Sequence, residues 1–306
     1  MNTALDWERD GADWPHREYS QFVEAGGITF HVQLAGAADA PPLLLVHGTG
    51  AASHTWRGML PLLARTFRVI APDLPGHAFS EPLPPRDMTL NGLAAALSAL
   101  LTRLGLAPAL AVGHSAGAAL LARMAIDRRI TPRSLISLNG ALLPLPGLVG
   151  HFFSPMAKLL AVNPFAPRLV AWRAMDPSAV GRLIAGTGST LDETGTALYA
   201  RLVRSPGHVR AVLNMLAGWD LKTLERDLPG LDVSTLLVIG EQDRTVPPDE
   251  AVRAAKLIRH ARVLRMARAG HLLHEEHPEE TVRIIESQYR RGAAHDVRQP
   301  ARAAAS

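Results

Sequence analysis

The segment Gly113-His114-Ser115-Ala116-Gly117 places a serine between two glycines in the pattern G-x-S-x-G. A short apolar stretch precedes it and a helical stretch follows it, so the segment has the strand–turn–helix setting that this pattern needs. Glycines on both sides allow a sharp turn that exposes the serine hydroxyl. The start of the helix offers backbone N–H groups to a developing oxyanion. We therefore expect Ser115 to be a nucleophile and the amide of Ala116 to be an oxyanion donor.

A serine hydroxyl is a weak nucleophile, so it needs a base, and the base needs a carboxylate to orient it. Two loops that follow predicted strands further along the chain supply Asp243 and His271. The order Ser, Asp, His is the one that a G-x-S-x-G serine uses. Asp243 alone could be a turn carboxylate and His271 a solvated loop histidine, and Glu241 is a competing carboxylate. Their joint positions predict the catalytic triad Ser115, Asp243 and His271.

The loop His-Gly-Thr-Gly over residues 47–50 follows another apolar strand, in the place of the loop that donates the second oxyanion N–H group. We expect the backbone of Thr49 to act there together with that of Ala116. His47 is expected to form a hydrogen bond within this loop. His114 either packs under the serine turn or lines the substrate pocket.

Neither a metal nor a cofactor is expected. His271, His274 and His277 are spaced by three residues, but Pro278 follows directly and no H-E-x-x-H pattern occurs. The chain has no cysteine, which excludes cysteine ligands, disulfides and a cysteine nucleophile. No phosphate-cradling G-x-x-x-x-G-K-[ST] loop or dinucleotide fingerprint is present, and the glycine pair within residues 186–189 is interpreted as a turn.

The elements around these loops alternate between strand and helix, which predicts an α/β protein with a doubly wound, mostly parallel sheet. Ligands of such sheets bind beyond the carboxyl ends of the strands, where the three triad loops lie. The expected strands are residues 22–24, 28–34, 43–46, 68–71, 109–112, 134–138, 235–239 and 262–266. The expected helices are residues 56–64, 90–104, 116–126, 249–258 and 278–289.

The alternation stops over residues 141–220, which contain several helical stretches and no clear strand. This block predicts a helical cap inserted between two parts of the α/β core, residues 19–140 and 221–291. Residues 1–18 are expected to form an extended arm, and the Ala- and Arg-rich residues 292–306 a disordered tail.

Apolar side chains of the cap cannot all face water, so we expect some of them to cover Ser115 and line an apolar pocket. The candidates for this lining, besides His114, are Phe153, Met156 and Trp172. Arginines of the cap could meet carboxylates of a ligand. The candidates for that role are Arg168, Arg173, Arg201 and Arg204.

The composition is that of a globular protein, with 306 residues, 47% hydrophobic and 20% charged residues, and a formal net charge of +4. The scattered arginines and the 5% aromatic content give no reason to expect nucleic-acid binding. Acidic residues interrupt the N-terminal region, so it does not resemble a signal peptide. No apolar run reaches the roughly 18 residues of a membrane span. We expect a cytoplasmic protein, with peripheral membrane contact through residues 142–153 as a further hypothesis.

These motifs resemble the α/β-hydrolase superfamily over residues 20–290, which implies the α/β-hydrolase fold with an inserted cap. The matching segments are residues 46–48, 73–77, 113–117, 240–243 and 270–271. Ala78 stands where the family often has glycine, a departure that concerns a turn rather than the triad. Haloalkane dehalogenases and epoxide hydrolases use aspartate as the nucleophile, so Ser115 argues against those activities.

Less generic segments resemble the magnesium-chelatase accessory hydrolases of bacteriochlorophyll biosynthesis. These segments are residues 7–15, 137–141, 153–158, 183–189 and 205–209. The resemblance implies a role near the insertion of magnesium into protoporphyrin, with a tetrapyrrole-like or small apolar substrate and magnesium-chelatase subunits as partners. It does not supply a reaction.

Three functions follow. The first is a serine hydrolase of an ester or related acyl compound that assists magnesium insertion. The second is a non-catalytic tetrapyrrole-binding or chaperone protein on a hydrolase fold. The third is a generic carboxylesterase or C–C-bond hydrolase without a role in pigment synthesis. A complete triad favours the first function over the second.

Overall fold

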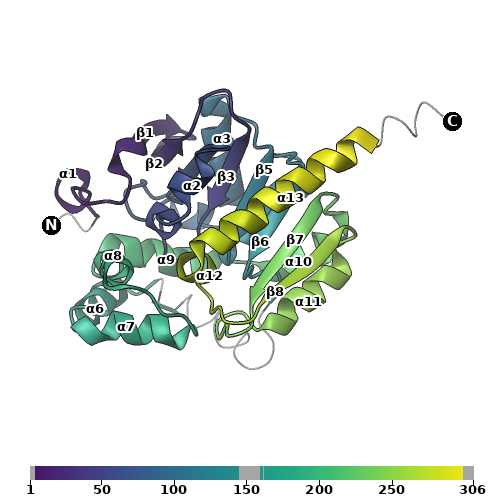
Figure 1. The fold of residues 1–306 in the computed structure, drawn as a ribbon. Helices are drawn as coiled ribbons and strands as arrows, with labels where there is room; N and C mark the ends of the chain where they lie inside the picture. The colour runs from purple at the N-terminus through teal and green to yellow at the C-terminus, as the bar shows by residue number, and fades with distance from the viewer. Residues whose placement is uncertain (1–3, 145–158, 161, 299–306) are drawn as a thin grey trace.

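The computed structural model describes residues 4–144, 159–160 and 162–298. Its centre is an eight-stranded sheet in the order β1-β2-β4-β3-β5-β6-β7-β8 (Figure 1). β2 pairs antiparallel with both β1 and β4, and all other neighbours are parallel. The strands are β1 (Ser20–Ala25), β2 (Ile28–Ala35), β3 (Pro42–Val46), β4 (Arg68–Pro72), β5 (Leu110–His114), β6 (Ser134–Leu138), β7 (Ser234–Gly240) and β8 (Ala261–Met266).

Helices cover both faces of this sheet, which confirms the expected α/β class. The helices of the core are α2 (Leu60–Leu63), α3 (Leu90–Leu104), α4 (Ala116–Ile126), α10 (Leu221–Asp227), α11 (Pro248–Leu257), α12 (Leu273–Glu276) and α13 (Pro278–Arg298). Between β6 and α10, the described residues form no strand. They form α6 (Ala166–Arg173), α7 (Pro177–Gly186), α8 (Glu193–Val203) and α9 (Pro206–Gly218).

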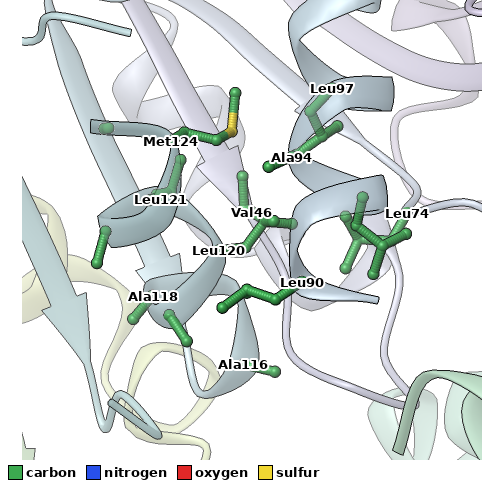
Figure 2. Close-up of a cluster of buried hydrophobic side chains, with 14 of the residues drawn as sticks. Val46, Leu74, Leu90, Ala94, Leu97, Ala116, Ala118, Leu120, Leu121 and Met124 are labelled. Atoms are coloured by element: carbon green, nitrogen blue, oxygen red, sulfur yellow. The ribbon is translucent and has the colours of Figure 1, made fainter. Parts of the chain in front are cut away.

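The central strands are apolar along their whole length because both of their faces are buried. In β3, Leu44 and Val46 join the hydrophobic cluster on the side of α3 and α4, whereas Leu43 and Leu45 join the cluster on the other side. This alternation follows the two-residue period of a strand. Figure 2 shows Val46 packed among side chains of α3 and α4. The layers on both sides hold the carboxyl ends of the strands in a fixed arrangement.

Two helix predictions were wrong in extent. The helix expected over residues 56–64 is a 3₁₀ turn at Ser53–Trp56 followed by the single turn of α2, with Pro61 in the first turn of α2, where its missing N–H group costs nothing. The helix expected over 278–289 continues to Arg298, because the Ala- and Arg-rich sequence favours helix. Residues 292–298 are therefore helical and not part of a disordered tail. The other tail residues lie outside the described part.

The N-terminal region packs on the core, so the expectation of an extended arm was wrong. It contains the helical turn α1 (Trp7–Asp10), and the side chain of Trp14 is only 2% exposed. Trp14 joins a cluster with Phe79 and with Leu198 and Leu202 of α8, and its Nε1–H group donates to Ser53 Oγ at 3.2 Å. Burial of a large indole ring stabilises this arrangement.

Trp14→Ala should lower the free energy of unfolding by about 3–5 kcal/mol, because it empties a buried aromatic site. Trp172→Ala is the matched control: that side chain is 67% exposed on α6, so the loss should stay within about 0.5 kcal/mol. Urea denaturation followed by circular dichroism measures both values. Equal losses in the two variants would show that Trp14 is not part of the folded core.

Candidate active site

The turn between β5 and α4 places Ser115 in a strained backbone conformation. Its φ of 51° lies in the left-handed region, which costs a non-glycine residue on the order of 1–3 kcal/mol. The flanking glycines are required by close packing: a Cβ atom on Gly113 would lie 2.5 Å from the amide nitrogen of Ala118, and one on Gly117 would lie 2.2 Å from the carbonyl oxygen of Val46. The G-x-S-x-G pattern thus has a steric cause.

Hydrogen bonds from the next strand hold this turn. The amide of Ser115 donates to the carbonyl of Leu138, at the end of β6, at 3.0 Å. The carbonyl of Ser115 accepts from the amides of Ala118 and Ala141, both at 3.1 Å. The serine is half-buried, and its position is defined by backbone contacts on both sides.

The predicted base and acid lie together. Nδ1 of His271 lies 2.8 Å from Oδ2 of Asp243, and both residues are buried. The amides of Thr245 and Val246 donate to the other carboxylate oxygen, Oδ1, at 2.7 and 3.0 Å. A carboxylate can only accept here, so Nδ1 carries the proton and Nε2 of His271 is the basic nitrogen.

The competing carboxylate, Glu241, is placed differently. Its side chain is 42% exposed, and its Oε1 atom lies 3.9 Å from the guanidinium of Arg265. His271 pairs with Asp243 instead. The difference follows from the loop after β7, whose turn directs Asp243 inward toward the loop after β8.

Asn139 connects the loop that carries His271 to the end of β7, directly before the loop that carries Asp243. It follows β6 with a φ of 45°, and its Nδ2 donates to the carbonyls of Gly270 and His271 at 2.8 and 2.9 Å. Its Oδ1 accepts from the amide of Gly240 at 2.8 Å. His114 Nε2 also donates to the His271 carbonyl, at 2.9 Å. Sequence reasoning missed Asn139, although an asparagine after an apolar strand is a signal for a left-handed turn.

A turn of the inserted helical segment holds the backbone on both sides of His271. Ser189 Oγ accepts from the amide of Leu272 at 2.8 Å and donates to Oε2 of Glu276 at 3.0 Å. The same Glu276 oxygen accepts from the amide of Gly270 at 2.8 Å. The residues before and after His271 are therefore tied to one hydroxyl–carboxylate pair, which sequence reasoning also missed.

The same turn touches the loop of Asp243. Gly188 has a φ of 85°, and a Cβ atom there would lie 1.9 Å from the carbonyl oxygen of Gln242. The amide of Arg244 donates to the carbonyl of Thr187 at 3.1 Å. The turn predicted over residues 186–189 thus packs between the loop that carries Asp243 and the loop that carries His271.

The loop after β3 lies beside the serine. A Cβ atom on Gly48 would lie 2.9 Å from Nδ1 of His114 and 3.0 Å from Cβ of Ser115, so the glycine allows this close approach. His47 Nε2 accepts from the amide of Leu74 at 2.9 Å, which leaves Nδ1–H to donate to the carbonyl of Gly48 at 2.8 Å. His47 therefore forms its hydrogen bonds in and beside this loop, as expected. Thr49 directly follows Gly48 in this loop.

The two predicted oxyanion donors occupy the expected elements. Ala116 is the first residue of α4, where N–H groups have no acceptor within the helix. Thr49 follows β3, and its hydroxyl lies 3.6 Å from the sulfur of Met215 on α9. Next to it, His208 Nε2–H donates to the carbonyl of Gly50 at 3.3 Å. Helix α9 thus packs directly on the loop after β3.

His208 also fixes a strained turn. Its Nδ1 accepts from the amide of Ala78 at 3.1 Å, and Ala78 has a φ of 42°. Glycine adopts this left-handed conformation without steric cost. Here an alanine adopts it, held by a histidine of α9.

The other predicted binding residues are distributed differently. His114 is buried under the serine turn. Phe153 and Met156 lie outside the described residues, and Trp172 is on the outer surface of α6. Arg201 pairs with Asp13 at 2.6 Å, so it is not free to meet a ligand carboxylate. Among the other candidates, Arg204 Nε donates to the carbonyl of Ala174 at 2.9 Å, and Arg168 and Arg173 are exposed.

The three histidines after β8 do not converge on a point. His271 pairs with Asp243, His274 Nε2 lies 2.7 Å from Thr55 Oγ1, and His277 Nε2 lies 3.0 Å from the carbonyl of Arg268. In the part of the chain that the structure describes, no group of three His, Cys, Asp or Glu residues has a geometry that could hold a metal ion.

A buried polar network surrounds Glu275, four residues after His271 in the chain. The side chain of Glu275 accepts from Thr55 Oγ1 at 2.7 Å, from the hydroxyl of Tyr199 at 2.8 Å and from Arg57. Burial raises the pKa of Glu275, while Arg57 opposes this shift. Since Tyr199 belongs to α8, this network joins the inserted helices to the core.

Several histidines around the site are buried and neutral. Loss of hydration lowers the pKa of His274 to about 3 and that of His208 to about 4. Burial also lowers the pKa values of His47, His77 and His114. None of these rings is expected to carry a charge at neutral pH.

The model of the alpha/beta hydrolase fold family matches residues 41–278, and the chain belongs to this family. Over 264 residues, the chain is 38% identical to the magnesium-chelatase 30 kDa subunit of Rhodobacter capsulatus, which covers 86% of this chain and 92% of that protein. It is 30% identical over 278 residues to 2-hydroxy-6-oxo-2,4-heptadienoate hydrolase of Pseudomonas putida, with 88% and 95% covered. Both resemblances found in the sequence are confirmed.

Solved structures have the same fold. An alpha/beta hydrolase fold protein from Burkholderia ambifaria superposes with a TM-score of 0.72 at 26% identity, over 86% of this chain and 96% of that chain. A haloalkane dehalogenase from Bradyrhizobium elkani superposes with a TM-score of 0.73 at 24% identity, over 90% and 99%. The second likeness concerns the fold alone.

The buried histidines predict that acid destabilises the protein. Unfolded histidines titrate near pH 6.5, whereas folded His274 and His208 titrate at about 3 and about 4. Between these values the unfolded chain binds more protons, so the free energy of unfolding should fall as the pH falls from about 6.5 to about 4. Thermal denaturation at a series of pH values measures this.

The variant His208→Gln removes one of these titrating groups. Its melting temperature should depend less steeply on pH over the same interval than that of the original protein. An unchanged melting temperature of the original protein between pH 8 and pH 5 would contradict the assignment of neutral buried histidines.

Proposed function

We propose that the protein is a serine hydrolase in which Ser115 is the nucleophile, His271 the general base and acid, and Asp243 the orienting carboxylate. The observation that carries the proposal is the contact of 2.8 Å between His271 Nδ1 and Asp243 Oδ2, next to the strained serine turn. The three residues come from the loops after β5, β7 and β8, at one edge of the sheet. Acyl transfer needs these three groups.

The reaction on an ester or related acyl compound then has two stages. Ser115 Oγ attacks the acyl carbon while His271 Nε2 takes the hydroxyl proton, and Asp243 stabilises the imidazolium. The backbone N–H groups of Ala116 and Thr49 would stabilise the oxyanion. When the intermediate collapses, His271 returns the proton to the leaving group. Water, deprotonated by His271, hydrolyses the acyl-enzyme and restores Ser115.

We further propose that this activity serves the insertion of magnesium into protoporphyrin, as an accessory function. The 38% identity to a magnesium-chelatase 30 kDa subunit over nearly the whole of both chains supports this role. The substrate would then be a tetrapyrrole-like or other apolar acyl compound, and magnesium-chelatase subunits would be the partners. A non-catalytic tetrapyrrole carrier on the same fold is the alternative within this role.

A second candidate function is hydrolysis of a C–C bond without a role in pigment synthesis. The 30% identity to 2-hydroxy-6-oxo-2,4-heptadienoate hydrolase over 88% of the chain favours it specifically. Both candidates use the same serine, acid and base, so the substrate distinguishes them.

Ser115→Ala should abolish labelling by a fluorophosphonate probe and hydrolysis of a test ester, because it removes the nucleophilic oxygen. Asp243→Asn should lower kcat on the order of 10⁴-fold by favouring the wrong histidine tautomer. Glu241→Gln is the matched control and should leave kcat unchanged, since Glu241 faces Arg265 and not His271. Full turnover by the Ser115→Ala variant would refute the assignment. A damaging Glu241→Gln change would identify another carboxylate.

The pathway role predicts ligand binding. Protoporphyrin or its magnesium complex should quench the fluorescence of the five tryptophans in a saturable titration, whereas ATP should not bind, because the chain lacks a phosphate-cradling lysine loop. Probe labelling without tetrapyrrole binding would favour the second candidate function. Tetrapyrrole binding without probe labelling would favour the carrier.

A further inference from the structure

Exposed apolar side chains are concentrated in one part of the protein. In the described residues, ten large apolar side chains are more than a third exposed, and eight of them lie between residues 159 and 183. The other two, Phe22 and Val263, are far apart in the sequence. Scattered exposed apolar residues need no explanation, whereas a concentration of them marks an interaction surface.

Helix α6 has an inverted distribution of side chains. Its small residues Ala166 and Ala171 are buried, and Ala166 packs with Val209 and Leu213 of α9. Its large residues point outward: Leu169 is 58% and Trp172 is 67% exposed. An ordinary surface helix buries its large apolar residues and exposes polar ones. Contact with water alone therefore does not account for the distribution of side chains on α6.

The exposed residues of α6 form one stripe. Phe165, which directly precedes α6, is 69% exposed, and Phe165, Leu169 and Trp172 follow one another at intervals of four and three residues, the spacing of a single helix face. Met175 and, on α7, Leu183 extend the apolar region. Figure 1 places α6 and α7 at the outer end of the inserted helices, away from the sheet. We call Phe165, Leu169, Trp172, Met175 and Leu183 the outer apolar surface.

Arginines outnumber carboxylates beside this surface, where Arg168, Arg173 and Arg182 stand against the single carboxylate Asp176 between residues 159 and 183. Arg168 and Arg173 flank the stripe, and residues 159–175 include no aspartate or glutamate. Among the described residues, no carboxylate forms an ion pair with either arginine, whereas Arg182 on α7 pairs with Asp176 at 2.8 Å. An apolar stripe with aromatic rings and free guanidinium groups fits the boundary between the acyl chains and the phosphates of an anionic bilayer.

We propose that the outer apolar surface, with Arg168 and Arg173, binds peripherally to an anionic lipid bilayer. The large side chains would enter the boundary region while the guanidinium groups bind lipid phosphates. This surface differs from residues 142–153, where the sequence suggested membrane contact. Leu142 and Leu143 are buried, and residues 145–153 lie outside the described part.

Peripheral binding is also compatible with the helices themselves. No helix among the described residues has the length and apolar character needed to cross a bilayer. A protein partner is the other possible occupant of an apolar surface. The charged groups beside this surface that form no ion pair among the described residues are Arg168 and Arg173, and two arginines favour the phosphates of a membrane.

Flotation of the full-length protein with vesicles tests the proposal. One set of vesicles is an equimolar mixture of phosphatidylcholine and phosphatidylglycerol, and the other is phosphatidylcholine alone, each at low and high salt. We expect binding to the anionic vesicles at low salt, weaker binding at high salt, and little binding to the neutral vesicles. Absence of binding to the anionic vesicles at low salt would overturn the proposal.

Matched variants localise the contact. Leu169→Ser with Trp172→Ser should reduce vesicle binding on the order of tenfold or more, as should Arg168→Glu with Arg173→Glu. Val263→Ser removes an exposed apolar side chain elsewhere and should change nothing. Circular dichroism confirms that each variant is folded. Equal binding of the Leu169/Trp172 variant and the original protein would exclude this surface.

The protein-partner alternative has its own readout. Sedimentation of the original protein and the Leu169/Trp172 variant reports whether this surface joins two copies of the chain. Self-association that the variant loses, without vesicle binding by either form, would assign the surface to a protein contact and overturn the membrane proposal.

Discussion

The left-handed turn at Ser115 is the constraint on which the rest of the site depends. A strained residue persists only where its surroundings determine its conformation. Here the surroundings are the close contacts of Gly113 with α4 and of Gly117 with β3, together with the hydrogen bond from Ser115 to Leu138 on β6. These contacts require the parallel order β3-β5-β6 and a helix directly after β5. The sheet is covered on both faces, so it holds the strained turn at Ser115 rigidly in place.

His271 is held by more than its contact with Asp243. The backbone around His271 is bonded to Asn139 and Glu276 of the core and to Ser189 in the turn before α8. The inserted helices are therefore part of the arrangement of His271, and not only a cover over the sheet. The contact of Gly188 with the backbone of Gln242 joins the same turn to the loop that carries Asp243. A substitution in this turn would alter the distance between acid and base even though it lies far from both in the sequence.

Much of this could be predicted from local sequence. The strands and the residues Ser115, Asp243 and His271 follow from short patterns: apolar runs, a glycine-flanked serine, and polar residues after strands. The contacts of Asn139 with Gly270 and of Trp14 with Leu198 join residues far apart in the chain, so no local pattern contains them. The same holds for Arg201, whose partner Asp13 lies in the N-terminal region. Composition suggested an extended arm there, but the burial of Trp14 outweighs the polar character of its neighbours.

The inserted helices have one apolar surface that packs on the core and another that stays exposed, and the segment of α6 and α7 contributes to both. On the inner side, Ala174, Val180 and Ile184 pack in a cluster with Leu272, the residue after His271. On the outer side, the large residues of α6 remain exposed. Because the small residues face inward, α6 can lie close to α9 while its large residues are left for an external contact. α7 ends at Gly186, directly before the turn that holds Ser189. The chain that forms the outer apolar surface thus continues into the backbone that positions His271.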